Sequence, residues 1–211
     1  MTAKPTAAGA QTATLSIKDG VGTQVVQLVI DNPVPTLTSL SPSSAIAGSA
    51  GFPLTVNGTN FVSTSVVNWA GSPRATTFVS ATQITATINT ADVAKAGTFK
   101  VTVTNSAPGG GTTAAHNFVV DNPVPTLTSI SPSSATHGGP AFTLTATGAA
   151  FVPGSSIEWN GKKLATTYVS STTLTGTVPA AAIKTAGTAS VTVVNSTPGG
   201  GTSAPATFTI N

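Results

Sequence analysis

Five carboxylates and two histidines are the side chains in this sequence best suited to acid–base chemistry or metal binding. General acid–base catalysis needs two such groups that can be brought together at one reacting bond. No cysteine is present, so neither a disulfide nor a thiolate metal site can form. The carboxylates stand singly along the chain, at Asp19, Asp31, Asp92, Asp121 and Glu158. This scatter predicts a protein that is not an enzyme and that binds no cofactor.

An internal repeat sets the organisation of the chain. Asp31-Asn32-Pro33-Val34-Pro35 returns from Asp121 onward, and the offset of 90 residues holds without insertion or deletion to the last residue. A fixed period of this kind indicates copies of one structural unit. We expect module 1 at residues 31–120 and module 2 at residues 121–211. Residues 1–30 are expected to form a flexible tail, over residues 1–11, and the terminal hairpin of a truncated preceding module.

The repeat weakens each candidate for chemistry. Asp31 and Asp121 are one position counted twice, whereas Glu158, His116 and His137 have no counterpart in the other repeat. Calcium between modules would need six to eight oxygens, usually from several carboxylates, and each junction supplies one Asp. We expect the junctions Asp31-Asn32 and Asp121-Asn122 to cap turns through their side chains and the histidines to be solvated loop residues.

Glycine loops and short motifs allow other interpretations. The triple glycines at residues 109–111 and 199–201 lead into strand-like runs, whereas a phosphate cradle needs a following helix, so we expect hairpin turns. Asn57-Gly58-Thr59 and Asn195-Ser196-Thr197 match the N-glycosylation pattern, which is short enough to occur by chance. Trp69 and Trp159 could stack on sugar rings if exposed, but their place on inward-facing strands favours core packing.

The composition favours β-structure and excludes two classes of partner. Charged residues make up 6% of the chain, against about 25% in an average soluble protein. The net charge of +3 comes from scattered cations, so no basic face for nucleic acid is expected. No apolar run approaches the length of a membrane span, about 18 residues.

Alternating apolar residues predict the strands. Residues 12–17 and 24–30 flank Lys18-Asp19-Gly20 and predict a hairpin. In each module the residue pattern predicts about seven short strands and one helical turn, which lies at residues 90–96 in module 1. The expected fold is all-β, with two tandem immunoglobulin-like (E-set type) β-sandwiches preceded by a partial module. The residues expected to matter most for this structure are Trp69, Trp159, Phe61, Phe151, Gly58, Gly148, Pro33, Pro35, Pro123 and Pro125.

The order of these motifs resembles a known family. Both modules carry Pro-Thr-Leu-Thr-Ser-(Leu/Ile)-Ser-Pro-Ser-Ser, then Gly-x-x-Phe at Gly58 and Gly148, then Val/Ile-x-Trp. This order resembles the IPT/TIG immunoglobulin-like domain, in the tandem forms of large bacterial exported proteins. The family's usual Gly-Gly after the third strand is Ala70-Gly71 in module 1, which we expect to change a turn and not the fold.

The resemblance implies a non-catalytic spacer or adhesion segment of a bacterial extracellular or cell-surface protein, with neighbouring modules as its partners. One alternative is a self-assembling filament or virion-decoration subunit, in which copies of the chain join by strand addition. Another alternative is a carbohydrate-binding accessory module for a surface glycan. Some animal members contact DNA through basic loops, but the matching loops here lack clustered Arg and Lys.

Overall fold

The computed structural model describes residues 11–19 and 22–211. The described residues divide into two compact units, with the boundary between Val119 and Val120. The flexible tail expected over residues 1–11 lies outside the described residues, except for Gln11. That residue already begins a strand, so the tail prediction is wrong at this position.

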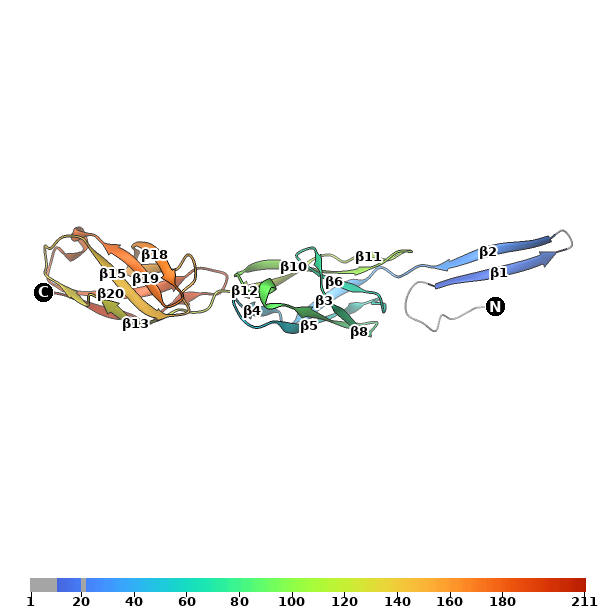
Figure 1. The fold of residues 1–211 in the computed structure, drawn as a ribbon, viewed down its shortest axis with the longest axis horizontal. Coiled ribbons are helices and arrows are strands. Elements are labelled where there is room, and N and C mark those ends of the chain that lie inside the picture. The colour runs from blue at the N-terminus through green and yellow to red at the C-terminus, as the bar shows by residue number, and fades with distance from the viewer. Residues whose placement is uncertain (1–10, 20–21) are drawn as a thin grey trace. The chain divides into compact units, whose positions relative to one another are not determined.

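The first element is a two-stranded antiparallel hairpin (Figure 1). It consists of β1 (Gln11–Asp19) and β2 (Gly22–Ile30), with Leu15 opposite Val26 and Gln11 opposite Ile30. The two strands extend to the turn that Lys18-Asp19-Gly20 predicted, although residues 20–21 themselves are not described.

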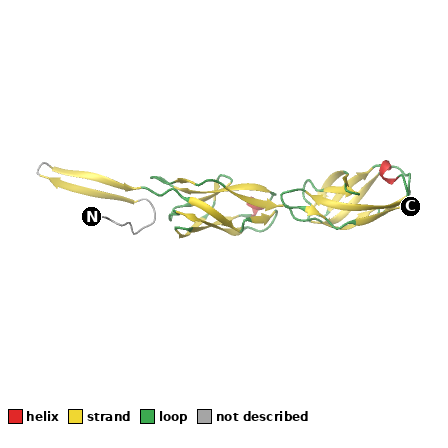
Figure 2. Ribbon diagram, turned by 180° about the vertical axis from the view of Figure 1, so that it is seen from behind, coloured by secondary structure: helices red, strands yellow, loops and turns green. Residues whose placement is uncertain are grey.

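Module 1 is a sandwich of two sheets (Figure 2). The first sheet has the order β3 (Thr36–Ser41), β5 (Phe52–Thr59), β9 (Gln83–Ile88), β8 (Thr76–Ser80). The second has the order β4 (Ser44–Ile46), β12 (His116–Asp121), β10 (Gly97–Asn105), β6 (Val66–Trp69), β7 (Ser72–Pro73), with β11 (Gly111–Thr112) also paired to β10. A single 3-10 turn, η1 (Thr90–Val93), lies within the predicted helical segment.

Module 2 repeats this topology. Its first sheet has the order β13 (Thr126–Ser131), β15 (Phe142–Ala149), β19 (Thr173–Val178), β18 (Ala165–Ser170). Its second has the order β14 (Ser134–Ala135), β22 (Ala206–Ile210), β20 (Gly187–Asn195), β16 (Ser156–Trp159), β17 (Lys162–Lys163), with β21 (Gly201–Thr202) beside β20. The helical turn is η2 (Ala180–Ile183). The predicted all-β, immunoglobulin-like sandwich is confirmed.

The sequence interpretation missed the shortest strands. β4, β7 and β11 have two or three residues each, too few for an alternating pattern to show. His116 begins strand β12, so its assignment to a loop was wrong. In the described residues no helix is long and apolar enough to cross a membrane.

The core of each module lies between its two sheets and centres on a tryptophan. Trp69 is 2% exposed, and its ring centroid lies 4.9 Å from that of Phe118. Trp159 is 5% exposed and lies 4.9 Å from Phe208 in the same tilted arrangement. Burying such aromatic pairs contributes both apolar area and favourable ring geometry.

The Gly-x-x-Phe motif has a steric cause. A Cβ built on Gly58 would lie 1.9 Å from the carbonyl oxygen of Thr36 and 2.6 Å from the Phe61 ring. On Gly148 it would lie 1.9 Å from the carbonyl oxygen of Thr126. The missing side chain therefore lets β3 and β5 approach while the buried phenylalanine fills the space beside them.

We expect Gly58→Ala to destabilise module 1 by about 3 kcal/mol or more, because the backbone oxygen of Thr36 cannot move without breaking the β3–β5 pairing. The measurement is urea unfolding of the full chain followed by tryptophan fluorescence. Gly97→Ala is the matched control, since its Cβ would meet Phe99 at an ordinary 3.6 Å. Equal stability of the two variants would contradict the steric explanation.

Candidate functional site

The carboxylates and histidines that could act in acid–base chemistry do not lie together in one site. Asp31 is exposed, Glu158 lies in β16 beside the core Trp159, and Asp92 lies in η1. His137 is exposed, and its Nδ1 lies 2.7 Å from the carbonyl oxygen of Asn211. Across the described ranges no three His, Asp or Glu side chains are grouped closely enough to hold a metal ion.

The first residues of module 1, residues 31–35, form what we call the leading segment. They are hydrogen-bonded to the glycine loop of the same module. The backbone N–H of Asn32 donates to the carbonyl of Pro108 at 2.8 Å, and the N–H of Gly110 donates to the carbonyl of Asn32 at 2.6 Å. The Asn32 side chain donates to the carbonyl of Ser106 at 2.7 Å. We call this contact the leading-segment clamp. The side chain reaches across the fold, so the local turn-capping role expected at Asp31-Asn32 is wrong for Asn32.

The clamp explains why two of the three loop residues, Gly109 and Gly110, are glycines. Gly109 and Gly110 have φ of +64° and +71°, a region that side chains with a Cβ rarely adopt. A Cβ on Gly109 would lie 2.5 Å from the Asp31 Cβ, and one on Gly110 would lie 2.4 Å from the carbonyl oxygen of Asn105. The loop does turn the chain from β10 into β11, as expected, but its composition also depends on this close approach.

A buried asparagine also binds the leading segment. Asn105 is 2% exposed, and its amide donates to the carbonyls of Pro33 and Asn60, each at 2.8 Å. Its Oδ1 accepts from the Ser65 hydroxyl at 2.6 Å, and that hydroxyl oxygen accepts from the N–H of Val62 at 2.8 Å. One side chain therefore holds the leading segment, the β5–β6 connection and β10 together.

Module 2 repeats both contacts. Asn195, also 2% exposed, donates to the carbonyls of Pro123 and Ala150 at 2.8 and 2.7 Å and accepts from Ser155 at 2.5 Å. The N–H of Asn122 donates to the carbonyl of Pro198 at 2.8 Å, its side chain to that of Ser196 at 2.8 Å, and the N–H of Gly200 to that of Asn122 at 2.7 Å. Pro35 and Pro125, which the sequence singled out for stiffness, are buried.

Module 1 also contains an ion pair that sequence analysis missed. The Arg74 guanidinium donates from Nε to Asp92 Oδ2 at 2.8 Å and from Nη2 to Oδ1, and the two side chains are 17% and 10% exposed. The N–H of Asn89 donates to Asp92 Oδ2 at 2.9 Å. Burial alone would raise the pKa of Asp92, but the hydrogen bonds from Arg74 and Asn89 and the Arg74 charge together lower it below its ordinary value.

The repeat carried a signal for this pair. Arg74 and Asp92 correspond to Leu164 and Ala182, so both charges are replaced together by apolar residues. Leu164 and Ala182 both pack against the core of module 2. A paired change between repeats of this kind indicates contact, and comparing the two modules position by position would have found it.

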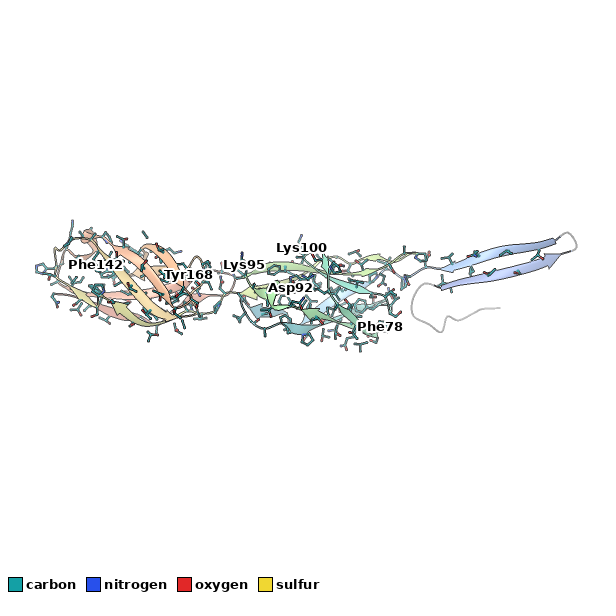
Figure 3. All side chains as sticks on the ribbon, viewed as in Figure 1. Phe78, Asp92, Lys95, Lys100, Phe142 and Tyr168 are labelled. Carbon is teal, nitrogen blue, oxygen red and sulfur yellow. The ribbon has the colours of Figure 1, made fainter. Side chains whose placement is uncertain are left out.

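The surface of module 1 has a shallow depression of about 490 Å³ beside the turn at Ala70-Gly71. Phe99, Lys100 and Thr102 line it. Lys100, which is labelled in Figure 3, is the one charged residue among its lining residues. Module 2 has Ala189 and Ser190 in place of Phe99 and Lys100. With a single cation and no acid, the depression offers no acid–base pair.

The aromatic residues bear on the carbohydrate alternative. Trp69 and Trp159 are buried, so their ring faces are not available to a sugar. Phe78 on β8 is half-buried, and its counterpart Tyr168 on β18 is 37% exposed. Tyr168 and Phe142 lie in different halves of module 2 (Figure 3), so these two rings do not form one platform.

The two glycosylation patterns are engaged in the fold. Both amide hydrogens of Asn195 are donated inside module 2, and its side chain is buried. Asn57 on β5 donates to the Ser39 hydroxyl at 3.2 Å and accepts from the Gln83 amide at 3.0 Å. A glycan on Asn195 would require the folded module to open.

The sequence profile of the IPT/TIG domain matches residues 35–120 and 125–210. The chain belongs to the IPT/TIG family. The resemblance to the IPT/TIG domain is therefore confirmed, with two domains in tandem. A comparison with curated protein sequences finds no match.

Solved structures are similar to this chain at low sequence identity. The adhesin InvE of Yersinia pseudotuberculosis is 14% identical over 84% of this chain and 58% of its own, with a TM-score of 0.51. SGBP-B of the Bacteroides ovatus mixed-linkage glucan utilization locus, in complex with a heptasaccharide, is 16% identical over 97% of this chain and 54% of its own, with a TM-score of 0.34. The plexin A4 extracellular region is 20% identical over 83% of this chain, which spans 15% of the plexin, with a TM-score of 0.35.

We expect Asn105→Ala to destabilise the first IPT/TIG domain by about 3 kcal/mol, because two buried carbonyls and the Ser65 hydroxyl lose their partner. Urea unfolding measures the loss. Asn68→Ala is the control, since this half-buried amide donates to Thr104 alone at 3.0 Å and its removal should cost about 1 kcal/mol or less. Faster amide exchange at Gly110 should accompany the first change and not the second. If the two variants lose equal stability, the buried network does not hold the domain together.

Asp92→Ala should destabilise the first domain by about 3 kcal/mol, because it leaves the Arg74 charge mostly buried and unpaired. Arg74→Leu together with Asp92→Ala should restore most of that loss, since it installs the residue pair of the second domain. A double variant as unstable as Asp92→Ala would show that the pair cannot be exchanged.

The pH dependence provides an independent check. Because the folded pKa of Asp92 is lowered, the pair stabilises fully above the unfolded carboxyl pKa of about 3.9, and this stability is lost as the pH falls through the folded pKa. Acid unfolding below about pH 4 should therefore be less steep in the double variant than in the wild-type chain.

Proposed function

We propose that this chain is a load-bearing spacer segment of a bacterial extracellular or cell-surface protein. The observation that carries the proposal is the pairing of the second strand of module 2, β14, with its last strand, β22. β14 runs parallel to β22, with Ser134 beside Thr209 and Ala135 beside Ile210. Three backbone hydrogen bonds link these ends: Thr209 N–H to Ser133 at 3.0 Å, Asn211 N–H to Ala135 at 2.9 Å, and His137 N–H to Asn211 at 2.7 Å.

Parallel pairing of a strand near the start of a module with its last strand matters when a chain is pulled from both ends. Tension draws β14 toward its start and β22 toward its end, so the hydrogen bonds between them are loaded together along the strands. Antiparallel ends would instead open one bond at a time. In module 1 the corresponding strands β4 and β12 are neighbours in the sheet order as well.

The clamps support the same role. The residues leading into each module are fixed to that module by backbone and asparagine hydrogen bonds, so force reaches the sandwich through ordered backbone. The extracellular location rests on the family's tandem forms in bacterial exported proteins. An enzyme is not proposed, because the described acids and histidines form no catalytic pair.

We expect Thr209→Pro to lower the unfolding force of one of the two modules in single-molecule pulling of the full chain. Proline removes the N–H that donates to Ser133 and with it about 1 kcal/mol of the paired contact.

Thr207→Pro is the matched control. Ser190 lies opposite Thr207 on β20, and its N–H and carbonyl are hydrogen-bonded to Asn160 on the other side of that strand. The Thr207 N–H therefore points to the β14 side of β22. Thr207 precedes Thr209 and Ile210, the residues of β22 that pair with β14. Equal unfolding forces for the two proline variants would overturn the load-bearing role of β14–β22.

A further inference from the structure

Two asparagines in the chain are each followed directly by glycine, at Asn57-Gly58 and Asn160-Gly161. This dipeptide permits a self-modification, because glycine has no side chain to hinder attack by its own nitrogen on the asparagine side chain. The two sites lie in different surroundings. Asn57-Gly58 lies within the inner strand β5, whereas Asn160-Gly161 forms the whole two-residue turn between β16 and β17.

The sheet holds Asn57-Gly58 in place. Gly58 is buried, and its N–H donates to the carbonyl of Thr82 at 3.0 Å. The Asn57 side chain donates to the Ser39 hydroxyl at 3.2 Å and accepts from the Gln83 amide at 3.0 Å. The nitrogen that would attack and the amide that would be attacked are therefore both occupied in the folded module.

The turn at Asn160-Gly161 leaves the attacking nitrogen unoccupied. Both residues are exposed, and their φ values of +50° and +76° are those of a type I′ hairpin turn. Among the described residues none accepts a hydrogen bond from the Gly161 N–H. The glycine nitrogen next to the Asn160 side chain is thus open to solvent.

The side-chain carbonyl of Asn160 is polarised by the neighbouring strand β20. The backbone N–H of Ser190 donates to Asn160 Oδ1 at 2.8 Å. Attack of a nitrogen on this carbonyl places negative charge on Oδ1, where the donor already lies. Lys162 and Lys163 follow the turn and Glu158 lies opposite Lys163, so the local charge is net positive and favours this anion.

We propose that Asn160 is a site of spontaneous deamidation through a cyclic imide with Gly161. The Gly161 nitrogen gives up its proton and forms a bond to Cγ of Asn160. The bond from Cγ to the amide nitrogen breaks, and that nitrogen leaves as ammonia. Water then adds to either carbonyl of the imide and opens it. The products are aspartate and isoaspartate, with NH2 replaced by OH and no oxidant or reductant consumed.

The isoaspartate product changes the turn itself. Its backbone runs through the former side chain, which adds one carbon to a turn of two residues. The closing pair of Trp159 and Lys162 cannot then keep its register. Module 1 has Ala70-Gly71 at this turn and cannot react there. The modification therefore distinguishes the two modules, and it is independent of the load-bearing role proposed above.

The test is incubation of the full folded chain at mildly alkaline pH, followed by digestion with pepsin in acid, where the attack stops. Mass spectrometry of the peptides measures the replacement of NH2 by OH at residues 160 and 57, and labelling by isoaspartyl methyltransferase detects isoaspartate. Asn160 should convert at least about tenfold faster than Asn57, because reaction at Asn57 requires the β5 pairing to open.

The same incubation in concentrated urea is the control for sequence effects. The two rates should become similar there, because both sites are Asn-Gly and neither is folded. An unmodified Asn160, equal rates at the two sites in the folded chain, or a difference that persists unchanged in urea would overturn the proposal.

Ala70→Asn installs the site in the matching turn of module 1. Ala70 and Gly71 have φ of +49° and +82°, and the N–H of Ala70 donates to the carbonyl of Lys100 at 2.8 Å. The N–H of Asn160 donates to that of Ser190 at the same distance. Asparagine adopts this left-handed conformation more readily than alanine, so the variant should fold. The introduced asparagine should convert at a rate close to that of Asn160; if it stays unmodified, the turn does not promote the reaction and the proposal is wrong.

Discussion

One buried amide in each module connects three segments that are distant in sequence. Asn105 joins the leading segment through Pro33, the β5–β6 connection through Asn60 and Ser65, and its own strand β10. Apolar burial drives these segments together but does not choose their mutual register, because it has no direction. Hydrogen bonds inside a low-dielectric core do have direction, and leaving one unmade costs free energy. The amide therefore specifies how the chain approaches its own sandwich.

The same approach of the chain to its sandwich requires the glycine loop and the leading segment to lie close together. Asn32 can reach the carbonyls of Ser106 and Pro108 only where the loop offers backbone without side chains. Gly109 and Gly110 supply this surface, at a conformational cost that glycine tolerates. This explains why Asp-Asn-Pro-Val-Pro and Pro-Gly-Gly-Gly recur together in both modules, although they lie far apart along the chain.

The sequence predicted what alternation encodes. Leu54, Trp69 and Val101 follow the period-2 pattern of a half-buried strand, and all three are core residues. Strands of two residues carry no such pattern, and the contact between Asn105 and Pro33 joins positions 72 apart. A buried Asn at the end of an apolar strand was visible in both repeats, but only the folded backbone identifies the carbonyls it serves.

The differences between the two modules bear on the proposed role. Arg74 with Asp92 gives way to Leu164 with Ala182, and Lys100 to Ser190, whereas every residue of the clamp keeps its type. A binding surface works through side chains that face solvent, and one of these, the exposed Lys100, is replaced by Ser190. A segment that transmits force depends on how each module holds its own backbone, and here these contacts are the ones that repeat. This division favours a spacer whose repeats share their mechanics and vary in their surfaces.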